Sequence, residues 1–218
     1  MTAQRRVAAS VRPPVVVLLG GPSAEHDVSV VSGTAIAAAL AAEGFAVEQV
    51  LIDLDGRWWW LPAGHRREDR SPAAYDDPAA LGAEGPLAIG AAVDRLAASR
   101  PGPVVAIALH GPFGEDGTIQ AILDAAGLAY TGSGVAASAI GMDKALFKRL
   151  CRGIGLPVAD WREVRLDRWG SDPAAVRAEL EAFASGAADP RLMVKPARLG
   201  SSVGMTLVHD PSELEAAL

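Results

Sequence analysis

The sequence predicts an α/β protein in which a domain built on a parallel sheet is followed by a smaller α+β domain. Short β-branched runs alternate with longer helical segments up to Tyr130. Two of these runs, residues 15–19 and 104–109, are apolar without interruption, as in strands covered on both faces. The order strand, helix, strand favours a parallel sheet with right-handed crossovers. After Tyr130 helices dominate, and a pair of short strands follows near the end of the chain.

The composition is that of a globular protein with a substantial core. The chain has 218 residues, which corresponds to one large domain or two modest ones. Hydrophobic residues make up 50% and charged residues 21%, which excludes disorder and coiled coil. A net charge of −6 gives no basic field for nucleic acid or for an anionic membrane. The single cysteine, Cys151, excludes a disulfide framework and a multi-cysteine metal site.

The N-terminal segment carries no targeting signal that we can identify. Residues 1–13 are polar and basic without an apolar core, so we expect a disordered tail and no secretory signal. No apolar run approaches the roughly 18 residues of a membrane span. We therefore expect a cytoplasmic protein that contacts neither a membrane nor nucleic acid.

The first domain is expected to cover residues 14–134. Its predicted strands and helices are, in chain order, 15–19, 28–42, 47–54, 88–98, 104–109 and 119–126. The helix at 28–42 is predicted to bury Val31, Ala35 and Ala38. A turn at Asp55-Gly56 leads into a hairpin strand that carries Trp58–Trp60, with one or two rings packed on the sheet and another exposed.

The second domain is expected to cover residues 135–218. Its predicted elements are a mostly helical stretch at 135–153, a strand at 158–164, a helix at 173–183, strands at 192–195 and 204–208, and a last helix opened by Asp210-Pro211. Ser171 or Asp172 is the expected cap of the helix at 173–183, with Pro173 just inside it. The last helix reaches Leu218 without a capping residue, so we expect the sequence to end within an element.

The first candidate for chemistry is GGPSAEHDVSV, residues 20–30. A glycine pair after a buried strand allows a tight turn at the carboxyl end of the sheet, where open α/β folds bind ligands. The following helix offers free N–H groups to an anion. Glu25 and His26 lie at this turn; the competing interpretation is that Glu25 only caps the helix.

The second candidate is LHGPFGEDGTIQ, residues 109–120, which also follows a core strand. His110 could orient a carboxylate or transfer a proton. The alternative is a glycine-rich connector in which Glu115 and Asp116 cap the helix that begins near Thr118. Two such loops in one domain favour a shared ligand cleft.

The third candidate is MVKPARLGSSVGM, residues 193–205. Backbone N–H groups and hydroxyls of such a hairpin turn can surround phosphate oxygens, and Lys195 supplies charge. It is not a Walker P-loop, and an ordinary hairpin turn is the alternative. Lys144, at a helix start, would by itself be interpreted as a solvated lysine. Cys151, the tryptophan run and the charged cluster at 65–69 are interpreted as structural or solvated.

Together these segments resemble the D-alanine-D-alanine ligases of the ATP-grasp superfamily over nearly all of residues 15–218. The matching pieces are VVVLLGGPSAEHDVSVVSG, LIDLDGRWW, ALHGPFGEDGTIQAILDAAGLAYTGSGVAASAIGMDK, KRLCRGIGLPVADW and VKPARLGSSVG. The resemblance implies a Rossmann-like, pre-ATP-grasp domain at 14–134 and an incomplete central ATP-grasp domain at 135–218.

The resemblance also implies roles for individual residues. Glu25 matches the acid that positions the ammonium of the first D-alanine, and Ser201 the serine that hydrogen-bonds with that acid and helps to hold the active-site loop. His110 matches the histidine near the carboxylate of the first substrate. Lys144 and Lys195 match lysines that contact nucleotide phosphates. The residues that close over these phosphates are Gly200, Ser201 and Ser202.

The implied reaction is ligation of two D-alanines through an acyl phosphate for peptidoglycan precursor synthesis, with ATP and Mg²⁺ (or Mn²⁺) as cofactors. The family continues for roughly another hundred residues, which would hold the metal ligands, so we expect a truncated chain that is inactive alone. The resemblance implies a homodimer for the full-length enzyme. The alternatives are a related ligase with D-lactate or D-serine as acceptor, and a non-catalytic binding fragment.

Overall fold

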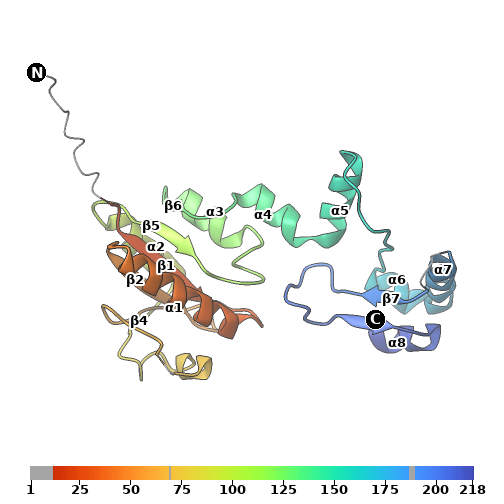
Figure 1. Cartoon of the computed structure of the whole chain (residues 1–218), viewed down its shortest axis with the longest axis horizontal. Helices are drawn as coiled ribbons and strands as arrows, with labels where there is room; N and C mark the ends of the chain where they lie inside the picture. The colour runs from red at the N-terminus through yellow and green to blue at the C-terminus, as the bar shows by residue number, and fades with distance from the viewer. Residues whose placement is uncertain (1–11, 69, 187–189) are drawn as a thin grey trace, which may run out of the picture. The chain divides into compact units, whose positions relative to one another are not determined.

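A computed structural model describes residues 12–68, 70–186 and 190–218, and these residues divide into two compact units (Figure 1). The first unit runs to Ser138 and the second from Ala139 to Leu218. Each unit is described separately below. Residues 1–11, which make up most of the expected N-terminal tail, lie outside the described part of the chain.

The first unit is built on a six-stranded sheet of mainly parallel strands, as predicted. The strand order is β4-β3-β2-β1-β5-β6. The strands are β1 (Val15–Gly20), β2 (Val47–Ile52), β3 (Trp58–Trp60), β4 (Glu84–Leu87), β5 (Val104–Ile107) and β6 (Ala129–Tyr130). β1 pairs in parallel with β2 and with β5, whereas β3 and β4 add an antiparallel edge. β1 and β5 therefore end side by side at one edge of the sheet.

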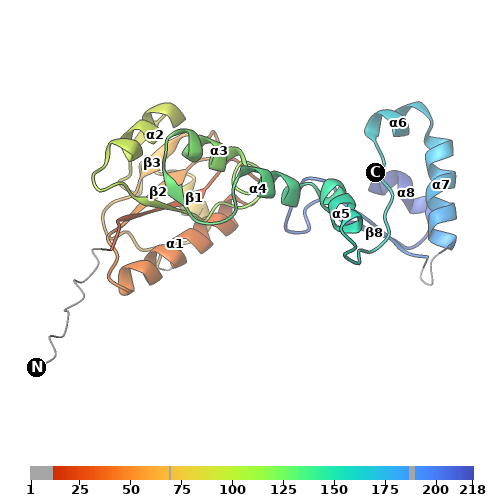
Figure 2. The same cartoon turned by 90° about the horizontal axis from the view of Figure 1, so that it is seen from above.

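Helices cover both faces of this sheet (Figure 2). α1 (His26–Ala42) packs on one face, and α2 (Ile89–Ala98) and α3 (Thr118–Ala125) on the other. All six residues of β1 are buried, because alternate side chains contact the helices on opposite faces. This two-sided burial explains why the strand has no polar position.

The buried face of α1 differs from the prediction. Val31, Ala35 and Ala38 are exposed, and the helix instead buries Val30, Gly33, Thr34 and Ala37 among others. A Cβ added at Gly33 would lie 2.4 Å from the Cβ of Leu19, so close contact with β1 selects the face that carries this glycine. The apolar residues of α1, mostly alanine and valine, are distributed over every side of the helix, so the sequence does not indicate which face is buried.

The antiparallel edge contains the tryptophan run. Trp58 and Trp60 are buried, and Trp59 is half-buried with its Nε1–H donating to Asp53 Oδ2 at 2.8 Å. Two rings therefore pack in the core as predicted, but the third is not simply exposed.

His65 also departs from the expected solvated cluster: its Nε2 lies 2.8 Å from Tyr75 Oη, and burial, with the nearby charge of Arg70, lowers its pKa.

The second unit has a small core between α7 (Pro173–Ser185) and a two-stranded antiparallel sheet. The core residues are Val176, Leu180, Val208 and Leu214. The other elements are α4 (Val135–Met142, which begins in the first unit), α5 (Lys144–Gly153), α6 (Leu166–Ser171), β7 (Leu192–Val194), β8 (Thr206–Val208), η2 (Pro211–Glu213) and α8 (Leu214–Ala217); η1 (Pro72–Tyr75) lies in the first unit. Asp172 caps α7 as expected, accepting from Ala175 N at 3.0 Å.

The strand predicted at 158–164 is wrong, because the segment has no regular structure. Side chains of α5 hold it instead: Lys148 Nζ donates to Ala159 O at 3.1 Å, and Arg152 pairs with Asp160 at 2.7 Å. A strand needs a neighbouring strand for its backbone hydrogen bonds, and among the described residues the sheet of this unit pairs only β7 with β8.

In the described part of the chain, no helix is long and apolar enough to cross a membrane.

Candidate functional site

The first group of predicted site residues gathers where β1 and β5 end. The segment after β1 turns at Gly20 and Gly21, which have φ of +81° and +99°. A Cβ added at Gly20 would lie 2.4 Å from Ile52 O, so a side chain cannot fit at this turn. His26 Nδ1 lies 2.9 Å from Gly21 O, which fastens the turn to the start of α1.

Glu25 precedes α1 and is buried, with 6% of its surface exposed. It makes no side-chain hydrogen bond that caps the helix, which argues against the purely capping interpretation. A Cβ added at Gly111 would lie 3.2 Å from Glu25 Oε1, so the carboxylate is directed toward the loop that carries His110. A buried carboxylate at the N-terminus of a helix is favoured by the helix dipole.

His110 is the third residue after β5 and is hydrogen-bonded to the segment that follows β1. Ser23 Oγ donates to His110 O at 2.8 Å, and Glu25 N donates to Ser23 Oγ at 3.1 Å. Ser32 Oγ lies 3.0 Å from His110 Nε2. The structure therefore brings Glu25 and His110, which are 85 residues apart in the sequence, to one edge of the sheet.

Glu115 and Asp116 accept backbone hydrogen bonds in the same loop, but only Asp116 contacts the start of α3, whereas the connector alternative expected both acids to cap this helix. Glu115 Oε2 accepts from Gly111 N at 2.7 Å. Asp116 accepts from Phe113 N and from Thr118 N, both at 2.9 Å. Burial of Asp116 acts to raise its pKa, but these hydrogen bonds outweigh it and lower the pKa. Both carboxylates are thus engaged by backbone N–H groups, and His110 remains the candidate for contact with a ligand.

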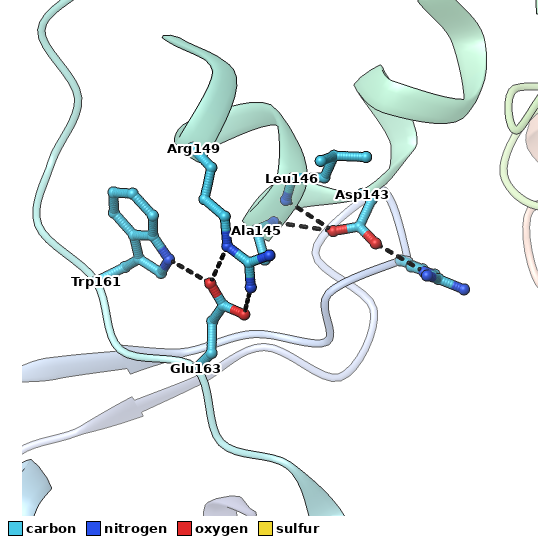
Figure 3. A network of polar contacts seen from close by, with 7 residues as sticks. Asp143, Ala145, Leu146, Arg149, Trp161 and Glu163 are labelled. Atoms are coloured by element: carbon cyan, nitrogen blue, oxygen red, sulfur yellow. Dashed lines mark hydrogen bonds and ion pairs between the residues drawn. The ribbon is translucent and has the colours of Figure 1, made fainter. Parts of the chain in front are cut away.

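The second group of predicted residues belongs to α5 and the β7–β8 hairpin. Asp143 caps α5: its Oδ1 accepts from Ala145 N at 3.1 Å and from Leu146 N at 3.0 Å, and its Oδ2 accepts from Arg198 Nε at 2.9 Å (Figure 3). The bond from Leu146 N and the ion pair with Arg198 lower the pKa of Asp143. Lys144 is the first residue of α5, as expected.

Lys144 reaches the hairpin loop with both its backbone and its side chain. Lys144 N donates to Ala197 O at 3.0 Å, and Lys144 Nζ donates to Leu199 O. Lys195 directly follows β7 and is exposed. Both lysines therefore lie at the loop that the sequence marks as a phosphate-binding turn.

The tip of this loop has the backbone of a tight, glycine-like turn. Ser201 and Ser202 have φ of +46° and +62°, a region that residues other than glycine rarely adopt. Val203 N donates to Gly200 O at 3.0 Å, and Met205 N to Ser202 O at 3.2 Å. The two serines are exposed and Gly200 is half-buried.

Alongside the cap of α5, a second polar network holds the following segment. Glu163 accepts from Arg149, with Nε at 2.9 Å, and from Trp161 Nε1 at 3.1 Å (Figure 3). The hydrogen bond from Arg149, followed by that from Trp161, lowers the pKa of Glu163. This network connects α5 to residues 161–163 within the second unit.

Several residues that build these two groups were not predicted from the sequence. In the first unit they are Ser23, Ser29 and Ser32, and in the second Asp143 and Arg198. Asp143 carried a usable signal, since an aspartate before a helix start is a favoured cap. The serines carried none, because their partners at 108–110 lie far away in the sequence. In the described residues, no group of three or more His, Cys, Asp or Glu side chains could hold a metal ion.

Family models of known proteins match residues in both units. The family model described as D-ala D-ala ligase N-terminus matches residues 14–133, and that described as D-ala D-ala ligase C-terminus matches residues 150–218. A D-alanine–D-alanine ligase of Kineococcus radiotolerans is 40% identical over 218 residues, which is 95% of this chain and 57% of the relative. The chain thus spans little more than half the length of this curated relative.

Solved structures show the same relationship. The D-alanine-D-alanine ligase of Coxiella burnetii has a TM-score of 0.67 at 27% identity, covering 94% of this chain and 59% of the solved one. The VanG D-Ala:D-Ser ligase of Enterococcus faecalis has a TM-score of 0.70 at 25% identity, covering 95% and 58%. These neighbours agree with the predicted α/β fold.

Proposed function

We propose, because the chain belongs to the D-alanine–D-alanine ligase family, that it serves the ATP-dependent joining of two D-alanines for peptidoglycan precursor synthesis. The observation that carries the proposal is the buried carboxylate of Glu25, which is directed toward the His110 loop at the ends of adjacent parallel strands. Ligands of open α/β sheets bind at this edge. A negative group beside a histidine suits the ammonium and carboxylate of an amino acid.

In this proposal Glu25 pairs with the ammonium of the first D-alanine, and His110 lies near its carboxylate. Lys144 and Lys195 contact the phosphates of ATP, and the turn at Gly200, Ser201 and Ser202 closes over them. The exposed, glycine-like turn supports this assignment, since its backbone can approach phosphate oxygens closely. Glu25 and Ser201 are the proposed catalytic residues.

The chemistry consists of two transfers. The carboxylate of one D-alanine attacks the γ-phosphorus of ATP, which forms an acyl phosphate and releases ADP. The amine of the second D-alanine then attacks the acyl carbon, loses a proton, and displaces inorganic phosphate. The lysine charges would stabilise the phosphoryl group during the first transfer.

Cofactors and assembly follow from family membership. We propose ATP together with Mg²⁺ or Mn²⁺, a cytoplasmic location and a homodimeric enzyme. The described residues contain no group that fits a metal site, so we assign no metal ligand and derive no step through the ion. Analytical ultracentrifugation would test the dimer.

A second candidate is a ligase that joins D-alanine to D-serine or D-lactate. The similarity to the VanG D-Ala:D-Ser ligase, at a TM-score of 0.70, supports it. Product analysis with D-alanine, D-serine and D-lactate as competing acceptors separates this candidate from the first. Binding of D-alanine without any product would instead favour a non-catalytic binding role.

The amino-acid site is tested by Glu25→Gln in an NMR titration of the chain with D-alanine, with L-alanine as the control ligand. We expect saturable shifts at residues 21–26 and 110–111, and an affinity at least about tenfold weaker in the variant, since a hydrogen bond to a charged group is lost. Equal affinities in the two proteins would contradict the role of Glu25.

The nucleotide site is tested by comparing Lys195→Ala with Lys148→Ala. Both substitutions remove one positive charge from the same unit, but only Lys195 adjoins the hairpin loop, whereas Lys148 contacts Ala159 O and the Trp161 ring. We expect weaker ATP binding by calorimetry in Lys195→Ala alone. Equal losses in the two variants would show that general electrostatics, and not the loop, determines affinity.

A further inference from the structure

Three serines of the segment 23–32 hydrogen-bond to Ala108 and His110, in the segment that follows β5. Ser29 Oγ donates to Ala108 O at 2.8 Å, and Ser23 Oγ donates to His110 O at 2.8 Å. Ser32 differs from both, because its Oγ contacts the imidazole of His110 and not its backbone. The backbone at 108–110 is thus held by two serines, and the ring by a third.

The hydrogen bonds of Ser32 determine which nitrogen of His110 carries a proton. Ser32 Oγ lies 2.9 Å from Val28 O and 3.0 Å from His110 Nε2. A carbonyl oxygen only accepts, so the single hydroxyl hydrogen of Ser32 is donated to Val28 O. The hydroxyl oxygen must then accept from His110, which requires a proton on Nε2.

We propose that Ser32 is a positioning residue that holds the His110 ring by its Nε2–H and so makes Nδ1 the nitrogen that meets the amino-acid ligand. A neutral ring held in this way presents Nδ1 as an acceptor, and a protonated ring presents Nδ1–H as a donor. In both states the ring plane and the nitrogen that does not contact Ser32 are the same. The ligand half of this inference rests on the proposed function, whereas the contact between Ser32 and His110 does not.

The contact of Ser32 with the His110 ring is separate from the hydrogen bonds that hold the backbone of the loop. Ser23 and Ser29 hold the backbone, and Glu115 Oε2 accepts from Gly111 N at 2.7 Å on the other side of His110. Removing the Ser32 hydroxyl therefore leaves the main chain of His110 fastened. Besides Val28 O within α1, only the His110 ring loses a partner, so its orientation and tautomer should change without loss of the fold.

The test compares Ser32→Ala with Ser32→Thr, which keeps the hydroxyl, and with Thr34→Val. Thr34 is the matched control, because its Oγ1 donates to Val30 O at 2.7 Å on the same helix but has no hydrogen bond to residues 108–110 in the described part of the chain. Long-range ¹H–¹⁵N correlations of the histidine rings report where the proton lies. The same samples are titrated with D-alanine.

We expect the proton of His110 on Nε2 in the wild-type chain, Ser32→Thr and Thr34→Val, and a mixture of tautomers in Ser32→Ala. The dissociation constant for D-alanine should rise about three- to tenfold in Ser32→Ala and stay unchanged in the other two variants. An unchanged ring pattern in Ser32→Ala overturns the proposal. A changed pattern with unchanged affinity overturns the positioning role.

If the wild-type chain binds no D-alanine, the proposed function fails by itself. The ring signals then still decide whether Ser32 holds His110, because they require no ligand. The two failures are therefore distinguishable.

Discussion

Residues 110–117 and 196–204 are both glycine-rich loops that follow a strand, but different groups hold them. The first loop follows a strand of a six-stranded sheet. Its own acids, Glu115 and Asp116, hold most of it, and Ser23 adds one hydrogen bond to His110 O from outside. The second leaves a two-stranded hairpin and is fastened from outside, by Lys144 and by the ion pair between Arg198 and Asp143.

The difference indicates what each loop can do. A loop whose backbone groups are satisfied by its own side chains keeps its shape when a ligand arrives, which suits positioning of His110. A loop held by two cations, the half-buried Lys144 and the exposed Arg198, can exchange those contacts for phosphate oxygens. Two loops with a similar glycine-rich sequence therefore differ in behaviour: we expect residues 110–117 to be rigid and residues 196–204 to be able to change conformation when a ligand binds.

The largest test of the rigid loop is Gly114→Ala. A Cβ at this position would lie 2.4 Å from Leu109 Cβ and 3.0 Å from Leu109 C, so the backbone must move. We expect the free energy of unfolding of the first unit to fall by about 2–3 kcal/mol, as in an overpacked core. Hydrogen exchange of β1 and β5 amides measures this loss.

Gly90→Ala is the control for this substitution, because nothing lies within 4 Å of a Cβ placed there. Alanine inside α2 should be neutral or slightly stabilising. If the β1 and β5 amides exchanged as slowly in Gly114→Ala as in Gly90→Ala, residues 110–117 could accommodate the added methyl group. The contrast between the two loops would then be wrong.

A smaller effect is expected for Asp116→Asn. The carboxylate accepts from two N–H groups with its two oxygens, and an amide has only one acceptor, so the variant should lose about 1–2 kcal/mol. The exposed Asp94, replaced in the same way, is the control. Hydrogen exchange at pH 7 measures both variants.

The pH dependence of the Asp116 variant has a definite sign. The folded-state pKa of Asp116 is lowered, so its contribution is complete above the unfolded value of about 3.9 and is lost as pH falls through the folded value. The stability difference between the wild-type chain and Asp116→Asn should therefore shrink in acid. A difference that grew as pH fell would contradict the assigned hydrogen bonds.

The smallest effect concerns the hairpin loop. Arg198→Ala removes an ion pair whose arginine side chain is 78% exposed, and such pairs contribute about 0–1 kcal/mol. We expect faster amide exchange at 197–204 with no change in the α7 core. Arg165→Ala removes a pair with Asp167 in which the arginine is similarly exposed, at 79%, and should leave amide exchange at 197–204 unchanged.

Much of the fold could be predicted because some local patterns allow only one structure. The uninterrupted apolar run of β1 requires cover on both faces, and Asp172-Pro173 marks the start of α7. Residues 158–164 form no strand, because an extended segment also needs a partner that local sequence does not reveal. The face of α1 was mispredicted since apolar residues, most of them alanine and valine, occur on every side of the helix.

The same division applies to the candidate site. Glu25 and His110 were candidates because of their positions after predicted strands, where backbone groups and side chains are available for ligands. Lys144 became a candidate only through the resemblance to a family, because a lysine at a helix start is by itself interpreted as solvated. The sequence alone could not show that Ser32 holds the His110 ring or that Glu115 and Asp116 are engaged by backbone N–H groups. Secondary structure depends on the properties of neighbouring residues, whereas the pairing of a donor with an acceptor 78 positions away depends on which strands lie side by side.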